Sequence, residues 1–232
     1  MGKAGRCCVP GRPAQEASLL NAMALYSYVV RYDSGFAPNP FYGFCTLATC
    51  KPRIRERAQV GDWVLGTGSA DRTVRRAGRL VYAMRVTEAL TWDQYAADPR
   101  FQKKQPFRRG SRKQSCGDNI YHRTTPAAAW QQRDSFHSRV DGTADPRHVA
   151  RDTGVDRVLI SDDYVYMGGD GPAIPHTLRD EAGRPLCKEG RGESKFTNAA
   201  VVNVFAAWID DLGYRGFQGV PFEWLTLRRR YG

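Results

Sequence analysis

The chain has 232 residues, and its 35 Lys and Arg against 24 Asp and Glu give a formal net charge of +11. This length favours a single domain with a sizeable buried core, and no apolar stretch approaches the roughly 18 residues that a transmembrane span requires. The basic charge predicts a polyanionic partner, nucleic acid first, although basic charge also serves solubility alone. An anionic membrane surface is not favoured, because no basic amphipathic helix is evident.

The first 22 residues are dominated by Gly, Pro, Arg and Ala, so they are predicted to form a flexible tail ahead of one domain at 23–232. They lack the apolar core of a secretory signal, which favours a cytoplasmic protein with reduced thiols. The six cysteines, at positions 7, 8, 45, 50, 116 and 187, include no C-x-x-C pair. We therefore expect no metal and no other cofactor.

Strand and turn patterns alternate through the first half of the chain. β-Branched and aromatic residues predict a strand at 25–32, followed by a loop with two prolines at 33–40. The next patterns predict a short apolar segment at 44–49, a helical turn at 53–58, a strand that opens at Gly61 and ends in a glycine loop by Gly68, a strand at 79–88 and a helix capped by Thr91. Trp63 is expected in the core.

The second half is more polar. Residues 96–126 form the densest basic stretch, and 131–148 are expected to form a loop. Strand patterns return at 156–160 and 163–167, and apolar positions spaced i, i+3, i+4 predict a helix at 198–211. Together the elements predict an α+β domain, built on a small, strongly bent mixed sheet or a β-barrel with flanking helices.

The loop after the first strand carries the first candidate catalytic residues. Asp33 follows the strand directly, and Asn39 lies between two prolines that restrict the backbone. Functional side chains concentrate on such rigid loops, where a fixed carboxylate orients a water or stabilises a developing positive charge. The same composition is equally typical of an ordinary turn built on Asx hydrogen bonds.

A second candidate pair is Asp118 with His122, because a carboxylate and an imidazole can share acid–base work near neutral pH. A hydrogen-bonding loop histidine is the alternative. The glycines at 61 and 66–68 offer backbone N–H groups to a phosphate, but a tight turn between strands explains them better. The motifs of serine hydrolases, zinc peptidases and zinc deaminases are absent.

The basic stretch favours nucleic-acid contact, because Lys and Arg neutralise phosphates while Phe and Tyr stack on bases. An Arg-rich run at 72–85 is expected on the same face; a solvated loop is the alternative. The predicted nucleic-acid contacts are Lys51, Arg53, Arg55, Lys103, Lys104, Arg108, Arg109, Arg112 and Lys113. The predicted base pocket consists of Tyr32, Phe36, Phe41 and Tyr121.

Three blocks carry a resemblance to a known family: YVVRYDSGFAPNPF at 28–41, CTLATCKPRIR at 45–55 and GDWVLGTGS at 61–69. With weaker matches at 81–84, 117–122 and 158–161, the chain resembles the nucleotide modification associated domain 2 family of bacteria and phages over residues 24–225. Residues 51–69 also resemble, more loosely, the lysine–proline, helix and Gly-Asp turn of PUA-like β-barrels, which accept an extruded base in a pocket. Likeness of fold does not fix function.

The resemblance implies an association with modified bases in nucleic acid and with phage–host conflict. Chemistry on a base requires flipping it into a pocket, and hydrolysis needs only water as co-substrate. The leading hypothesis is therefore a DNA glycosylase that excises a hypermodified base from phage DNA in antiphage defence. In it Asp33 stabilises the sugar cation or orients water, Asn39 reads the base or holds that water, and His122 or Asp118 assists.

Two alternatives come from other functional classes. A non-catalytic reader would bind the flipped base without forming product, and a base-modifying transferase would need a donor molecule. In each case DNA, most of all modified phage DNA, is the expected partner, and no membrane is involved.

Overall fold

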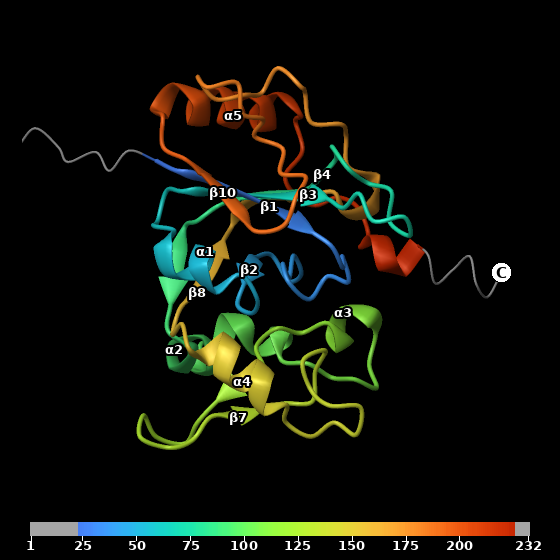
Figure 1. Ribbon diagram of the computed structural model, residues 1–232. Helices are drawn as coiled ribbons and strands as arrows, with labels where there is room; N and C mark the ends of the chain where they lie inside the picture. Colours follow the sequence, from blue (N-terminus) through green and yellow to red (C-terminus); the bar gives the residue numbers. More distant parts are fainter. Residues whose placement is uncertain (1–22, 226–232) are drawn as a thin grey trace, which may run out of the picture.

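The computed structural model describes residues 23–225 (Figure 1). The segment 1–22, for which a tail is predicted, and residues 226–232 lie outside the described residues. A central six-stranded sheet has the order β10-β1-β3-β4-β9-β11. Its strands are β1 (Leu25–Val30), β3 (Trp63–Gly68), β4 (Leu80–Arg85), β9 (Asp163–Tyr166), β10 (Glu193–Phe196) and β11 (Gly216–Phe217).

The sheet is mixed. Strand β1 runs parallel to β3 and antiparallel to β10, whereas β4 pairs antiparallel with both β3 and β9. The residues of β1 and β3 are almost all buried, as expected for central strands with both faces covered. The described strands form an open sheet with β10 and β11 at its edges, so the mixed sheet, and not the closed barrel, is the architecture observed.

Two smaller sheets complete the β structure. One has the order β2-β8-β5, formed by β2 (Cys45–Leu47), β8 (Val158–Ser161) and β5 (Glu88–Leu90). The other pairs β6 (Tyr121–His122) with β7 (Gln131–Gln132). The helices are α1 (Pro52–Arg57), α2 (Trp92–Ala97), α3 (Arg112–Ser115), α4 (Pro146–Thr153) and α5 (Ala199–Asp211), with 3₁₀ turns η1 (Pro99–Lys104) and η2 (Gly168–Asp170).

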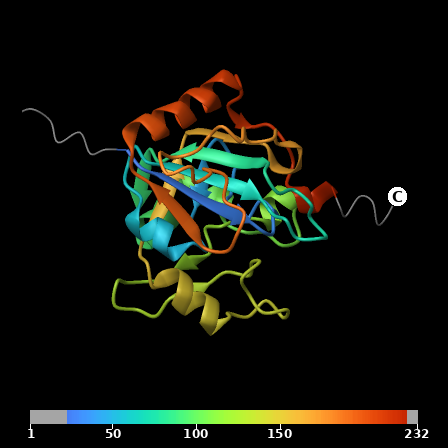
Figure 2. The ribbon, with the colours of Figure 1, turned by 45° about the horizontal axis from the view of Figure 1, so that its top comes forward.

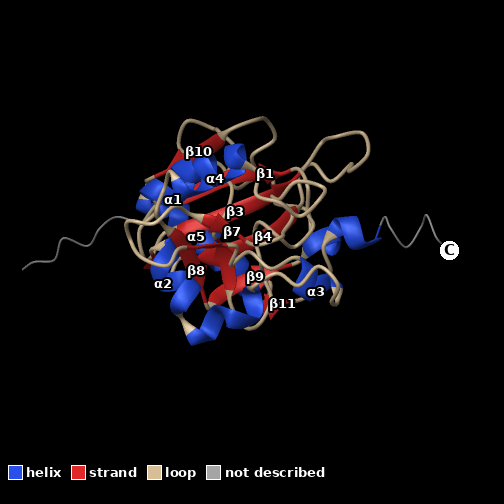
Figure 3. Ribbon diagram, turned by 90° about the horizontal axis from the view of Figure 1, so that it is seen from below, coloured by secondary structure: helices blue, strands red, loops and turns tan. Residues whose placement is uncertain are grey.

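The layers follow from the apolar faces of these elements. Helix α5 packs on one face of the large sheet, where Phe205 meets the Trp63 ring edge-on at 5.6 Å (Figures 1 and 2). The other face packs against β2, β8 and α1. A third cluster, around Trp92, Tyr95 and Phe101, holds α2, η1 and the segment before β6 beneath that layer. Viewed from below, α2 and α3 lie towards opposite sides of the strands (Figure 3).

Local patterns account for most of these elements. The α+β class is confirmed, as are the strands beginning at Leu25, Leu80, Val158 and Asp163, and Trp63 is buried. Thr91 caps α2 with a reciprocal capping box, and Asn198 caps α5. Within residues 23–225 no helix is long and apolar enough to cross a membrane.

Two predictions of local structure are wrong. Residues 66–68 continue β3 and do not form a loop; Gly66 is required there because a Cβ would lie 2.3 Å from the ring of Tyr82. The end of the stretch expected to be loop begins α4, which Asp145 caps and Pro146 opens. Pro is favoured at the first helical position, but the polar composition of this helix hides it from periodicity.

Candidate functional site

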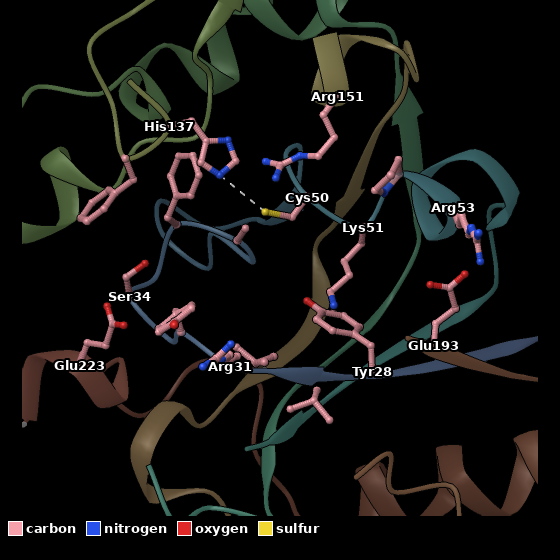
Figure 4. A pocket seen from close by; sticks show the side chains of 17 residues that line it. Tyr28, Arg31, Ser34, Cys50, Lys51, Arg53, His137, Arg151, Glu193 and Glu223 are labelled. Carbon is pink, nitrogen blue, oxygen red and sulfur yellow. Dashed lines mark hydrogen bonds between the residues drawn. The ribbon is translucent and has the colours of Figure 1, made fainter. Parts of the chain in front are cut away.

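A cavity of about 680 Å³ opens beside the end of β1 (Figure 4). It is lined by residues 28–32, 34, 36–37, 50–53, 136–137, 151, 193 and 223. These come from β1 and the loop after it, the start of α1, the loop before α4, the end of α4, the start of β10 and the turn at 222–225. The volume lies within the roughly 300–1,000 Å³ of small-molecule pockets, and aromatic and cationic side chains dominate the wall.

Tyr28 and Lys51 lie in the middle of the cavity. The Tyr28 hydroxyl is 2.9 Å from that of Tyr82, which holds the ring in place. The Lys51 ammonium lies 4.3 Å from the centre of the Tyr28 ring (Figure 4). Burial lowers the pKa of Lys51 from its ordinary value, because a desolvated ammonium loses hydration that the cation–π contact only partly replaces.

A carboxylate marks each end of the cavity as Figure 4 draws it: Glu193 from β10 near Arg53, and Glu223 near Ser34. Burial raises the pKa of Glu223, since a half-buried carboxyl resists ionisation. The pKa of Lys51 and the pKa of Glu223 are thus each moved towards neutrality, the direction in which burial tunes a lysine or a glutamate for acid–base work.

The turn that carries Cys50 and Lys51 is strained and firmly held. Both residues adopt the left-handed region, with φ of 59° and 40°, which costs about 1–2 kcal/mol for each non-glycine residue. The Cys50 N–H donates to Asp152 Oδ1 at 3.3 Å, and the Cys50 carbonyl accepts from Arg55 Nε at 3.0 Å. These bonds stabilise the turn that presents both side chains to the cavity, and such strain is often kept at functional sites.

Asp152, on α4, organises the opposite wall. Its Oδ2 accepts hydrogen bonds from His137 Nδ1 at 2.6 Å and from the Tyr121 hydroxyl at 3.0 Å. Its Oδ1 accepts from Arg151 Nε at 3.1 Å as well as from Cys50. Burial pushes the pKa of Asp152 upwards, but the hydrogen bond and charge of His137 and the charge of Arg151 outweigh it and hold that pKa at about 2.

His137 links this carboxylate to the thiol. Its Nε2 lies 3.7 Å from Cys50 Sγ, the contact drawn as a dashed line in Figure 4. The ring packs edge-on against Phe36 at 4.7 Å and lies 4.3 Å from the ring of His148. Burial lowers the pKa of His137, against the opposing effect of Asp152. A cysteine, a histidine and a carboxylate are thus joined in one line at the cavity wall.

The candidate residues of the proline-rich loop have partners inside the fold. The Asp33 carboxylate accepts hydrogen bonds from the Tyr166 hydroxyl and from the Phe222 N–H, and burial raises its pKa to about 6. Asn39 is fully buried; its Nδ2 donates to the Cys116 carbonyl at 2.8 Å and its Oδ1 accepts from Lys104 Nζ at 2.7 Å. Neither side chain lines the cavity.

Asp118 and His122 are not brought together. Asp118 is fully buried and accepts from the Thr46 and Tyr95 hydroxyls at 2.6 and 2.7 Å. His122 Nδ1 lies 3.0 Å from Arg133 Nη1, and its ring borders a separate hollow. The structure thus offers each of them a different set of neighbours, and the acid–base pair expected from their spacing does not form.

The predicted base pocket is half assembled at the cavity. Tyr32 and Phe36 line it. Phe41 is buried and stacks on Trp224 at 5.6 Å. Tyr121 is buried against Trp92 and reaches the site only through its bond to Asp152. Two of the four predicted residues therefore line the cavity, and their contact with a base stays a prediction.

The predicted phosphate contacts divide by burial. Lys51 and Arg53 line the cavity, and five cations are exposed: Lys103, Arg108, Arg109, Arg112 and Lys113. The guanidinium of Arg108 lies 4.5 Å from the ring of Phe136, a cavity residue, so the basic stretch reaches the rim. Arg55 and Lys104 are corrections: both are fully buried and donate hydrogen bonds to backbone carbonyls, which removes them from any phosphate.

Sequence reasoning missed Cys50, His137, Arg151 and Asp152. Cysteine spacing was weighed only for metal binding, which it disfavours, although Cys50 directly precedes Lys51 and Pro52 in the second block of the family resemblance. His137 and Asp152 lie in polar segments without periodicity, and the only local signal was the Asp-Pro start of α4.

A family model described as nucleotide modification associated domain 2 matches residues 22–228, nearly the whole chain. No curated protein and no solved structure matches. The family description associates the domain with modified nucleotides, and an aromatic and cationic cavity suits such a ligand. The chain belongs to the nucleotide modification associated domain 2 family.

Proposed function

We propose that this protein takes a modified base out of a nucleic-acid strand into the cavity and hydrolyses its N-glycosidic bond. The observation that carries the proposal is the placement of Lys51 and Glu223 on one base-sized cavity, with pKa values shifted in opposite directions. A raised glutamate pKa suits a general acid, and a lowered lysine pKa suits a nucleophilic amine. Hypermodified phage DNA is the substrate we favour, with excision serving defence.

The cavity wall supports a flipped base. Tyr32 and Phe136 line the cavity and are exposed, so their rings are accessible for stacking on a base, a contact worth about 1–3 kcal/mol per base. Arg31 and Arg53 lie on the same wall and are exposed, so they suit the phosphates on either side of an extruded nucleotide. The exposed cations from Lys103 to Lys113 extend this positive surface from the rim.

The reaction divides into two steps. Glu223, protonated to a higher pH than an ordinary glutamate, donates a proton to the departing base. The neutral amine of Lys51 forms a bond to the sugar C1′ as the bond from C1′ to the base breaks. The attached nitrogen then gives up a proton, and the ring oxygen O4′ takes one up as the bond from C1′ to O4′ breaks, which leaves an iminium on the opened sugar. Water hydrolyses this iminium and releases the lysine. The net reaction consumes one water and yields free base and an abasic site.

The test is incubation of the full chain with hypermodified and unmodified phage DNA, with released bases detected by mass spectrometry. We expect release from modified DNA alone, a fall of at least 100-fold in Lys51→Ala, and a borohydride-trapped covalent complex that requires Lys51. Lys195→Ala is the matched control, because Lys195 also lies over a tyrosine ring, 5.4 Å from that of Tyr26, but is not on the cavity.

Two outcomes would contradict the proposal. Tight stoichiometric binding of modified DNA without free base would favour the non-catalytic reader, which needs only the aromatic wall. Equal release by wild type and Lys51→Ala, with no trapped complex, would leave excision in place but remove Lys51 from it.

A further inference from the structure

The thiol of Cys50, the imidazole of His137 and the carboxylate of Asp152 form a chain that the excision reaction does not use. Sγ to Nε2 is 3.7 Å and Nδ1 to Oδ2 is 2.6 Å. This order of nucleophile, base and orienting carboxylate is the arrangement that activates a nucleophile on many unrelated folds. The three residues come from the turn before α1, the loop before α4 and α4 itself.

The hydrogen bonds fix the position of the proton on His137. Asp152 stays ionised, so its Oδ2 requires a donor, and Nδ1 of His137 supplies it. The other nitrogen, Nε2, is then unprotonated and faces the thiol. Because burial lowers the pKa of His137, the imidazole is neutral at pH 7 and ready to accept a proton. Burial and the charge of Asp152 raise the pKa of Cys50, so the thiol needs such a base.

The thiol reaches the cavity, unlike the other described cysteines. Cys45 and Cys116 are buried, and Cys187 is half-buried but does not line the cavity. Arg151 extends from α4 towards Cys50 and His137 in Figure 4, and its charge acts to lower the pKa of the thiol. A cation at this position suits the negative charge that develops on a carbonyl oxygen during attack at its carbon.

We propose that Cys50, His137 and Asp152 are a nucleophilic triad that removes an ester- or amide-linked acyl group from its substrate. His137 Nε2 takes the thiol proton as Sγ bonds to the carbonyl carbon; the bond from that carbon to its oxygen or nitrogen breaks, and the leaving group takes the proton from His137. Water hydrolyses the thioester and releases a carboxylic acid. Arg151 faces the oxyanion. The substrate class, an acyl-bearing base, rests on the proposed function, because the base then occupies the same cavity.

The test uses a small ester, so its result does not depend on binding or excision of a base. The full chain is mixed with 4-nitrophenyl acetate, the first turnover is followed by nitrophenolate absorbance, and the acetylated residue is located by peptide mass mapping. We expect a burst of one acetyl group per chain on Cys50, no burst in Cys50→Ser, and a fall of at least 100-fold in His137→Gln. The Cys187→Ala variant should retain the burst, because the Cys187 thiol does not line the cavity.

The rate of acylation should rise with pH through the lowered pKa of His137 and level off at a lower pH than an ordinary imidazole would give. The groups that face His137 are Asp152, Arg151, His148 and the Cys50 thiol. Because the pKa of Cys50 is raised, ionisation of the thiol by itself would increase the rate only at a higher pH than the titration of His137. A burst that persists in Cys50→Ser, an equal burst in His137→Gln, or a rate that rises only with ionisation of a free thiol would overturn the triad. A burst in the wild type alongside a failure to release bases would overturn excision alone.

Discussion

Replacing Arg55 with lysine tests whether this side chain stabilises the fold or grips nucleic acid. The guanidinium is fully buried and donates to four carbonyls: those of Cys50 at 3.0 Å, Val155 at 2.9 Å, Arg157 at 2.7 Å and Asp152 at 2.7 Å. Burial lowers its pKa to about 10, so the side chain stays charged at neutral pH. It ties the turn at Cys50 to the end of α4.

The magnitude follows from the hydrogen bonds that lysine cannot make. An ammonium is a point charge on a flexible stem and cannot reproduce the planar fork, so at least two of the four bonds are lost. Hydrogen bonds to charged groups contribute about 1.5–3 kcal/mol each, so two lost bonds predict a loss of about 3–6 kcal/mol from the free energy of unfolding. Urea unfolding followed by tryptophan fluorescence measures this loss as a lower midpoint at an unchanged m-value.

The control is Arg53→Ala, two residues earlier on α1, where the side chain is exposed on the cavity rim. It should change stability by less than about 0.5 kcal/mol and should weaken binding of DNA. If Arg55→Lys unfolds within about 1 kcal/mol of the wild type and instead loses affinity for DNA, the internal role is wrong and Arg55 contacts phosphate, as its place in a basic run suggested.

Three further substitutions test other parts of the fold. Asp33→Asn should lower the free energy of unfolding by about 1–3 kcal/mol, because one of two buried donors loses its acceptor, and base release per folded molecule should stay within twofold; a large loss of release at unchanged stability would make Asp33 catalytic. The difference in stability between wild type and this variant should narrow as pH rises from 4 to 7. The fold raises the pKa of Asp33 to about 6, so the stability that its protonation contributes is fully present below the pKa of the unfolded chain and is lost as pH rises through 6. Asn198→Ala should cost about 1 kcal/mol in urea unfolding, since Asn198 Oδ1 accepts from Ala200 N at 2.9 Å at the start of α5. Gly66→Ala should cost more than about 2 kcal/mol, or leave the protein insoluble, because the new Cβ meets the ring of Tyr82 at 2.3 Å; a soluble variant of wild-type stability would show that β3 relaxes freely there.

The elements that could be predicted are those whose signal is local. β1 is a continuous run of aromatic and β-branched residues, and α5 has an apolar stripe behind an asparagine cap. Helix α4 was missed because only Asp152 of its eight residues is fully buried, so no apolar period marks it. Strands β6, β7 and β11 have two residues each, too few to leave a local pattern.

The site was harder to predict because polarity in a loop does not reveal whether a side chain points outwards. Asn39 lies between two prolines as predicted, but its side chain is buried in the fold, where it forms hydrogen bonds with Cys116 and Lys104. The same ambiguity affected Lys104, which belongs to a basic run yet ends in the core. Cys50 and His137 are separated by 87 residues, and the Asp152 carboxylate on α4 brings them together because it accepts from the Cys50 N–H and from His137 Nδ1.

The proximity of Cys50 and Lys51 raises the question of how two nucleophiles share one cavity. Burial favours the neutral form of both side chains, so it lowers the pKa of Lys51 and raises the pKa of Cys50. Desolvation therefore makes the amine more reactive and the thiol less so. The thiol becomes competent only through His137, which in turn depends on Asp152 for its orientation. The strained turn at Cys50 and Lys51, which the hydrogen bonds of Arg55 stabilise, thus places a reactive amine beside a thiol that needs His137 as its base. A substrate that leaves Nε2 of His137 out of reach therefore reacts only with the amine.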